Sequence, residues 1–255
     1  MAARSSLAEP SLADPARLLA AWEAGAGAPE LARGCAVLGA AGLADPASVL
    51  DLPLGLVGYL GLRCHLTSFG SQVDALTACQ ACGATLDVAL SLTELLPGSA
   101  DAPPGQAPAR ALDLAGGVVT LRSPTVRDLI AAAADADPRG ALVRRCGQGP
   151  GPAPVEVAGL GPDELALVDE ALEDLSGLGL ITVRAACPDC AEPVAALLDP
   201  AALLWQQVQD AAPALLRDVA TLAAAFGWSE REILALPAVR RRAYLQLAAA
   251  EAAGR

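Results

Sequence analysis

The chain has 255 residues, 17 of them basic and 29 acidic, which gives a formal net charge of −12 at pH 7. All 17 basic residues are Arg, and the chain contains no Lys. This balance argues against general nucleic-acid binding, which depends on a basic surface that neutralises phosphates. The apolar content excludes a disordered chain, and no apolar run reaches the roughly 18 to 20 residues that a membrane span needs.

The N-terminus, MAARSSLAEP, lacks the apolar stretch of a secretory signal. We therefore expect a soluble, cytoplasmic protein with no membrane partner. Only 3% of the residues are aromatic, so the core must be built mainly from Leu, Val and Ala.

Four Asp-Pro pairs predict helix starts, because Asp favours the N-cap position and Pro favours the first helical turn. The pairs lie at 14–15, 45–46, 137–138 and 199–200. We expect residues 1–66 to form a helical N-terminal segment. The predicted helices cover Pro15–Ala24, Pro29–Ala41, a short stretch after Pro46, and Leu54–Cys64.

Four of the seven Cys form two pairs with one spacing, Cys79 with Cys82 and Cys187 with Cys190. Two residues between thiolates allow a tight turn to aim both sulfurs at one ion, and two such turns complete a tetrahedral shell. The two pairs together predict one zinc ion. Because four sulfurs leave no position for water, this zinc would be structural. Two independent redox pairs, or thiols that lie apart, are the alternatives.

Strand-like stretches flank both Cys pairs, which is typical of a zinc ribbon, where two hairpin tips face each other across the metal. The pairs are separated by 104 residues, whereas compact ribbons place them about 15 to 20 apart. Residues 67–198 therefore predict a ribbon that is split by an insertion over about 91–179. The expected strands cover 72–78, 85–90, 180–186 and 194–197.

Inside the insertion, alternation about Gly116-Gly117 predicts a hairpin over 111–121. Pro- and Gly-rich residues predict loops at 97–108 and 147–162. Helical spacing and start signals predict helices over 125–134, 138–146 and 163–175.

The C-terminal segment, residues 199–255, predicts a long helix ending at Gly227, a short helix over 230–236 with a capping box at Ser229, and a final helix after Pro237. The fold class expected for the whole chain is α+β, mainly α. Helical N- and C-terminal segments surround a zinc ribbon that is split by a long insertion of a β-hairpin and helices.

Several motifs, taken in order along nearly the whole chain, resemble the T4-like phage baseplate protein family. The C-terminal motifs are the most specific of these. The chain departs from the family pattern after the second Cys pair, where relatives tend to have Gly and this chain has Ala191. The motifs are Leu18-Leu-x-x-Trp-Glu23, the CxxCG at Cys79, Arg122-x-Pro124-x-x-x-Asp128, Leu142-x-x-Arg145-Cys146, the CPxC at Cys187, Phe226-Gly-Trp-Ser-Glu230 and Arg240-Arg241-x-x-Tyr244.

The resemblance implies a role in baseplate hub assembly in contractile phage tails or in phage-tail-like injection systems. The implied partners are baseplate or hub proteins. The implied location is the cytoplasm of the bacterial host cell, with incorporation into the particle as the alternative.

The residues themselves do not indicate an enzyme, because they include no Gly-rich phosphate loop, no Ser/His/Asp set and no open metal site. We expect no small-molecule substrate.

Candidate partner-binding residues are of the types that dominate interface energetics; for the aromatic ones, core packing is the alternative. They are Trp205, Phe226, Trp228, Arg240, Arg241 and Tyr244. The alternative function is a zinc-ribbon nucleic-acid-binding or regulatory protein.

Overall fold

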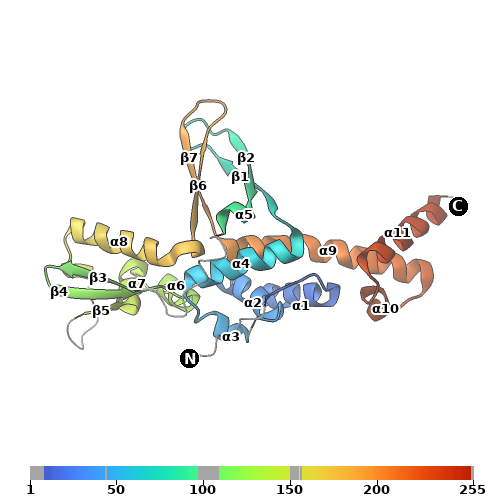
Figure 1. The fold of residues 1–255 in the computed structure, drawn as a ribbon, viewed down its shortest axis with the longest axis horizontal. Helices are drawn as coiled ribbons and strands as arrows, with labels where there is room; N and C mark the ends of the chain where they lie inside the picture. The colour runs from blue at the N-terminus through green and yellow to red at the C-terminus, as the bar shows by residue number, and fades with distance from the viewer. Residues whose placement is uncertain (1–8, 44, 97–108, 150–154, 156, 254–255) are drawn as a thin grey trace.

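The computed structural model describes residues 9–43, 45–96, 109–149, 155 and 157–253. A helical body lies at the centre of an elongated molecule, and three parts project from it (Figure 1). The insertion extends from one end, the C-terminal helices extend from the other, and two hairpins rise from the middle. The loop expected at 97–108 and part of the one expected at 147–162 lie outside the described residues.

Five helices form the body, and all four Asp-Pro pairs begin a helix, as predicted. Buried Leu and Val side chains make up most of the core between these helices, including Leu38, Val57, Leu60, Leu204 and Val208. The helices are α1 (Pro15–Ala26), α2 (Arg33–Ala40, preceded by a 3₁₀ turn over Glu30–Ala32), α3 (Pro46–Val49), α4 (Leu54–Phe69) and the first part of α9 (Pro200–Phe226).

Glycines on α4 bring this helix into backbone contact with the segments on both sides of the second hairpin. A Cβ atom at Gly58 would lie 2.0 Å from the carbonyl oxygen of Leu178, and one at Gly61 would lie 3.0 Å from that of Pro200. Leu178 belongs to a 3₁₀ turn over Gly177–Gly179. Because the first hairpin starts directly after α4, this one helix positions both hairpins.

The two hairpins contain the strands expected from the sequence. Each hairpin is a separate two-stranded antiparallel sheet, with Val73 paired to Leu90 in the first and Val183 paired to Ala196 in the second. The strands are β1 (Gln72–Ala78), β2 (Thr85–Ser91), β6 (Ile181–Ala186) and β7 (Pro193–Leu198), and a short helix α5 (Leu92–Leu95) follows β2.

The insertion forms a small α/β unit with its own core, in which Leu121, Val143 and Val168 are buried. The predicted hairpin and all three predicted helices are present. The elements are β3 (Ala109–Leu114), β4 (Gly117–Arg122), α6 (Val126–Ala133), α7 (Pro138–Cys146), β5 (Gly147–Gln148), a 3₁₀ turn over Val157–Gly159, and α8 (Pro162–Ser176).

The distal part of α9 carries the C-terminal unit, α10 (Glu230–Leu234) and α11 (Ala238–Ala253). Gly227 ends α9 with a left-handed φ of 72°, and the Ser229 side chain accepts a hydrogen bond from the Glu232 backbone in the predicted capping box. α9 continues through Pro213 as one helix. Among the described residues, no helix combines the length and apolar character needed to cross a membrane.

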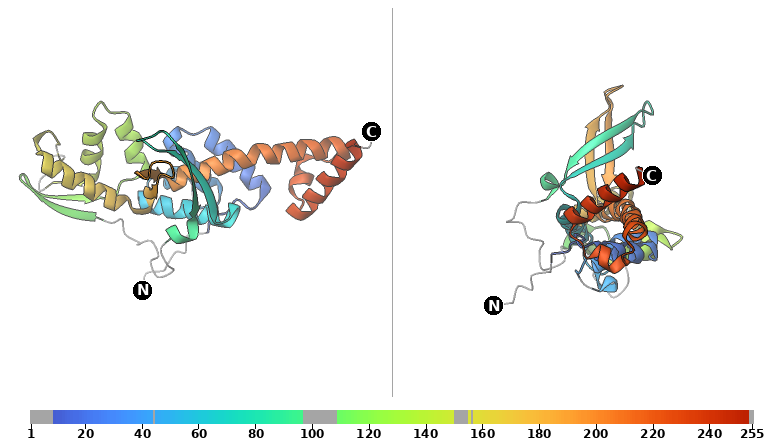
Figure 2. Two further views of the ribbon diagram at one scale, coloured as in Figure 1. Left: turned by 90° about the horizontal axis from the view of Figure 1, so that it is seen from above. Right: turned by 90° about the vertical axis from the view of Figure 1, so that its right-hand side faces the viewer.

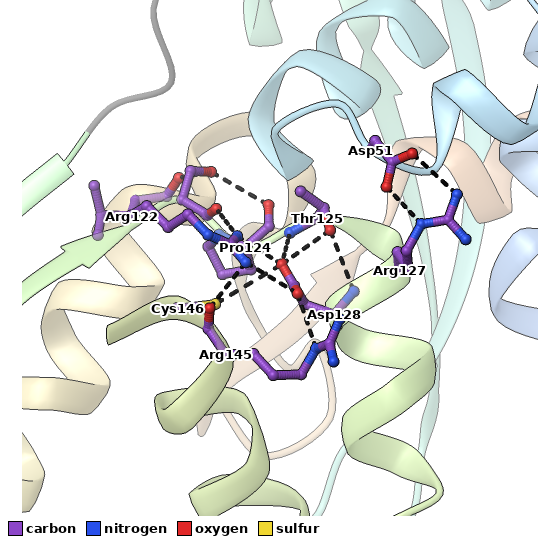
Figure 3. Close-up of polar contacts among 10 residues, drawn as sticks. Asp51, Arg122, Pro124, Thr125, Arg127, Asp128, Arg145 and Cys146 are labelled. Atoms are coloured by element: carbon purple, nitrogen blue, oxygen red, sulfur yellow. Dashed lines mark hydrogen bonds and ion pairs between the residues drawn. The ribbon is translucent and has the colours of Figure 1, made fainter. Parts of the chain in front are cut away.

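A buried carboxylate joins three elements of the insertion (Figure 3). Asp128 on α6 is 2% exposed and accepts two hydrogen bonds from Arg122 at the end of β4, at 2.6 and 3.1 Å. It also accepts one from Arg145 on α7 at 2.9 Å, and Thr125 donates through its backbone and its hydroxyl. Desolvation raises the pKa of Asp128, but the bonds from Arg122 and Thr125 outweigh it and hold the pKa well below its usual range.

We predict that Asp128→Ala lowers the free energy of unfolding by about 2–4 kcal/mol, because two guanidinium groups lose their shared acceptor. Since the pKa is depressed in the folded state, this contribution is complete above the unfolded-state pKa of about 3.9 and is lost as the pH falls below it. Urea denaturation of the wild type and the variant at pH 7 and pH 3 measures both effects.

Asp51→Ala is the matched control. Asp51 pairs with Arg127 on α6, but both side chains are about half exposed, so we expect a loss below about 1 kcal/mol. Equal losses for the two variants at pH 7 would contradict the role assigned to Asp128.

Candidate functional site

Both Cys pairs lie in hairpin turns that have the same backbone hydrogen bonds. In the first turn, the N–H of Gly83 donates to the carbonyl of Cys79, and the N–H of Cys79 donates to Ala84. In the second, Ala191 donates to Cys187 and Cys187 donates to Glu192, at distances equal to those of the first turn within 0.1 Å. The two sequence motifs therefore form the same local structure.

The two turns bring the four sulfurs together. The Sγ atoms of Cys79 and Cys190 are 3.7 Å apart, those of Cys82 and Cys187 are 3.6 Å apart, and all four lie within 4.8 Å of one another. Four sulfurs at about 2.3 Å from a central ion would be separated by about 3.8 Å. The separations are too long for disulfide bonds, so the group has the spacing of a shell that can hold one metal ion.

Local hydrogen bonds act in opposite directions on the two thiols of the first turn and favour the thiolate form of Cys79. Backbone N–H groups of Cys82 and Ala81 donate to the sulfur of Cys79 and lower its pKa to about 7. The backbone N–H of Ala84 lowers the pKa of Cys82, but hydrogen bonds with the thiols of Cys190 and Cys187 outweigh it and raise this pKa to about 12. Donors aimed at ligand sulfurs are the interactions that orient ligands in metal sites.

Between the sulfurs and the body, the facing sides of the two hairpins are loosely packed. A hollow of about 250 Å³ lies between them, and every residue that lines it is uncharged. Ala75 on β1 and Ala196 on β7 are too small to fill it. The hairpins thus contact each other near the tip, where Leu86 and Val194 are buried with two of the four Cys, and at the base, through a small core around Leu62 and Leu203.

The other three Cys, which are Cys35, Cys64 and Cys146, lie apart from the four paired Cys and are buried. Burial raises the pKa of Cys35 to about 12 and of Cys64 and Cys146 to about 11. His65 is also buried, and its Nδ1 lies 3.0 Å from the Gly70 carbonyl oxygen. Within the described parts of the chain, the four paired Cys are the only group of ligands spaced for a metal.

Three of the six candidate partner-binding residues stack on one another in the C-terminal unit. The ring centroids of Phe226 and Trp228 are 4.8 Å apart, and Tyr244 meets them edge-on at 5.6 and 4.8 Å. The three rings contact the buried Leu222 and Ile233 and remain partly exposed. This arrangement fixes the position of α11 against α9 and leaves one side of the aromatic cluster open to solvent.

Arginines border this aromatic cluster. Arg240 is exposed and lines a small hollow of about 150 Å³ with Trp228, Glu232 and Tyr244. Arg241 is partly buried and donates to the Leu236 carbonyl at 3.5 Å. Neither Arg has a carboxylate within ion-pair distance among residues that the structure describes.

The structure places Trp205 apart from the other five candidates. It lies in the body core, is 7% exposed, and its ring fills the space beside Gly25. The Arg33 guanidinium lies 5.8 Å from the ring centroid. These contacts give Trp205 a packing role in the body.

We predict that the purified chain contains one equivalent of metal and that Cys187→Ser lowers its metal content to below about a fifth, since three ligands no longer close the shell. We also expect the variant to melt at least about 5 °C lower, because metal binding contributes to folding free energy. Elemental analysis and calorimetry provide the two measurements.

Cys146→Ala is the control for metal content. Cys146 is buried in the core of the insertion and is not one of the four Cys that could hold the metal. It should keep the full equivalent even if it loses stability. A metal-free wild type, or a Cys187→Ser protein that keeps its metal, would contradict the assignment.

Ala191 has a φ of 62° and is the only residue other than Gly with a left-handed φ in the described part of the chain. It corresponds to Gly83, which has a φ of 75°. Because a Cβ atom costs about 1–2 kcal/mol in this conformation and Gly adds unfolded-state entropy, we predict that Ala191→Gly raises the free energy of unfolding by about 0.5–1 kcal/mol.

The reverse change, Gly83→Ala, should lower it by about 1–2 kcal/mol, and no neighbour within 4 Å of the new Cβ complicates the comparison. Ala195→Gly on β7 is the control and should be destabilising, because Gly weakens a strand. If Ala191→Gly were as destabilising as Ala195→Gly, the strained turn would be excluded.

Comparison of the chain with models of known protein families, with curated proteins and with solved structures finds no match. The baseplate resemblance accordingly depends on the sequence motifs alone.

Proposed function

We propose that the chain is a non-enzymatic assembly factor or minor component of the baseplate in a contractile phage tail or a related injection system. It acts by binding baseplate or hub proteins, and the ion held by Cys79, Cys82, Cys187 and Cys190 is a structural zinc. Four thiolates at tetrahedral spacing suit this soft, four-coordinate ion. When bound, zinc supplies a fixed link between the hairpin tips and no reaction chemistry.

The exposed hollow in the C-terminal unit is the observation that carries the binding proposal. Its walls are the rings of Trp228 and Tyr244, held in place by stacking, and its rim carries the exposed Arg240. Rigid aromatic side chains lose little entropy on binding, and Trp, Tyr and Arg dominate interface energetics. The position of this unit at the outer end of the molecule leaves it accessible to a large partner (Figure 1).

The nucleic-acid alternative is less well supported by the arrangement. The exposed Arg240 and Arg242 lie in the C-terminal unit, whereas the four Cys lie at the tips of the hairpins, a separate projection (Figure 1). The hairpins themselves carry one Arg, Arg184, together with the acidic Asp74 and Asp87. A ribbon with this charge offers little to attract phosphates.

The test is capture from an extract of cells that assemble a contractile tail together with this chain, with mass spectrometry as the readout. We predict that the wild type captures baseplate or hub proteins and that Arg240→Glu reduces their capture at least about fivefold, as expected when one interface residue is lost.

Arg184→Glu is the matched control, since it makes the same charge change on the exposed side of β6 and should leave capture unchanged. Equal capture by all three proteins would exclude the proposed surface. Capture of no tail protein, or tight nucleic-acid binding with a steep salt dependence, would overturn the proposed function.

A further inference from the structure

α11 packs on the rest of the C-terminal unit through one face and leaves the opposite face uncovered. Tyr244 and Leu245 contact the cluster around Leu222 and Ile233, and Ala248 is buried. On the other side, Val239 is 81% exposed and Leu247 is 55% exposed. These are among the most exposed large apolar side chains of the described residues.

The uncovered residues form a stripe along the helix. Val239, Ala243, Leu247 and Ala250 are all exposed, and their spacings of four, four and three place them on one face. The stripe spans about 17 Å at 1.5 Å per residue. An apolar stripe of this shape is best covered by another helix that lies along it.

Two charged side chains beside the stripe have opposite signs and are complementary to each other. Arg240 and Glu251 lie eleven residues apart, which is about three helical turns, so both border the same side of the stripe at opposite ends. Neither has an ion-pair partner among the described residues. Arg240, Arg241 and Arg242 also begin α11 with positive charge, which opposes the helix dipole.

We propose that the uncovered face of α11 binds the same face of a second copy of the chain in antiparallel orientation. A twofold axis near the middle of the stripe places Arg240 of each copy opposite Glu251 of the other, so two ion pairs form together. Val239 and Leu247 of one copy then cover the small residues Ala243 and Ala250 of the other.

The site is accessible to a second copy. α11 lies at the outer end of the molecule, away from the hairpins and the insertion, in the view from above (Figure 2, left). One helix pair buries less than the roughly 800 Å² per partner of a standard interface. We therefore expect a weak dimer, with a dissociation constant on the order of 100 µM.

Sedimentation equilibrium of the metal-loaded full chain from 5 to about 500 µM tests the proposal. The wild type should associate to a dimer, and Leu247→Glu should raise the dissociation constant at least about tenfold, because a charge then enters the apolar contact. Leu167→Glu is the matched control, since Leu167 is a 43% exposed Leu on α8, and it should dimerise like the wild type.

The charge pairs provide the decisive comparison. Arg240→Glu and Glu251→Arg should each weaken the dimer by about fivefold, and the double variant should return to within about twofold of the wild type, because the pairs are rebuilt with exchanged signs. A wild type that is monomeric at 500 µM, a Leu247→Glu protein that still dimerises, or a double variant without rescue would overturn the proposal.

This test is separate from that of the proposed function. Arg240 lines the Trp228–Tyr244 hollow, whereas Leu247 and Glu251 lie outside it, so the variants Leu247→Glu and Glu251→Arg separate the two surfaces. The readout for the dimer is the mass of the purified chain. Loss of the dimer with tail-protein capture intact, or the reverse, identifies which surface fails.

Discussion

The convergence of the four sulfurs depends on the close contact between α4 and the segments that flank the second hairpin. β1 follows α4 directly, while Gly58 and Gly61 hold the entry to β6 and the exit from β7 against the same helix. Any side chain at Gly58 would displace the backbone of Leu178, and the second hairpin, which follows Leu178, would shift relative to α4. The spacing of the Cys pairs therefore depends on backbone contacts at the base of the hairpins.

The close backbone contacts at α4 suit a core that is poor in aromatic residues. Ala and Gly allow helices to approach closely, but they contribute little apolar area per residue. The hollow between the hairpins, which Ala75 and Ala196 line, shows that small residues do not fill the space between these two sheets. Two-stranded sheets without a filled interface are only marginally stable by themselves. A metal at the tip would supply the attachment that side chains do not supply in the middle.

Local structure could be predicted from the sequence to a large extent. Each of the four Asp-Pro pairs correctly predicted the start of a helix, because the N-cap Asp and the first-turn Pro act on neighbouring residues. The two hairpin turns that carry the Cys pairs were predicted from the Cys spacing. The matching spacing of the two Cys pairs also predicted that turns 104 residues apart meet at one site, and the four sulfurs confirm this. What spacing could not show is that α4 holds the bases of both hairpins together. The Asp128 network was not predicted. Arg122, Asp128 and Arg145 belong to the sequence motifs quoted for the family resemblance, but nothing in their order indicated that one buried carboxylate joins three elements.

Side-chain exposure was the least predictable property, and the C-terminal segment shows why. Trp205 and Trp228 both lie on or beside apolar helical stripes, yet one fills the body core and the other borders an exposed hollow. In α11, apolar residues occur on both sides, so periodicity could not say which side packs on α9. The aromatic ring of Tyr244 decides it, because its stacking on Phe226 and Trp228 turns the Val239–Leu247 side outward. The few aromatic residues thus determine which apolar face of α11 packs into the core and which face stays exposed.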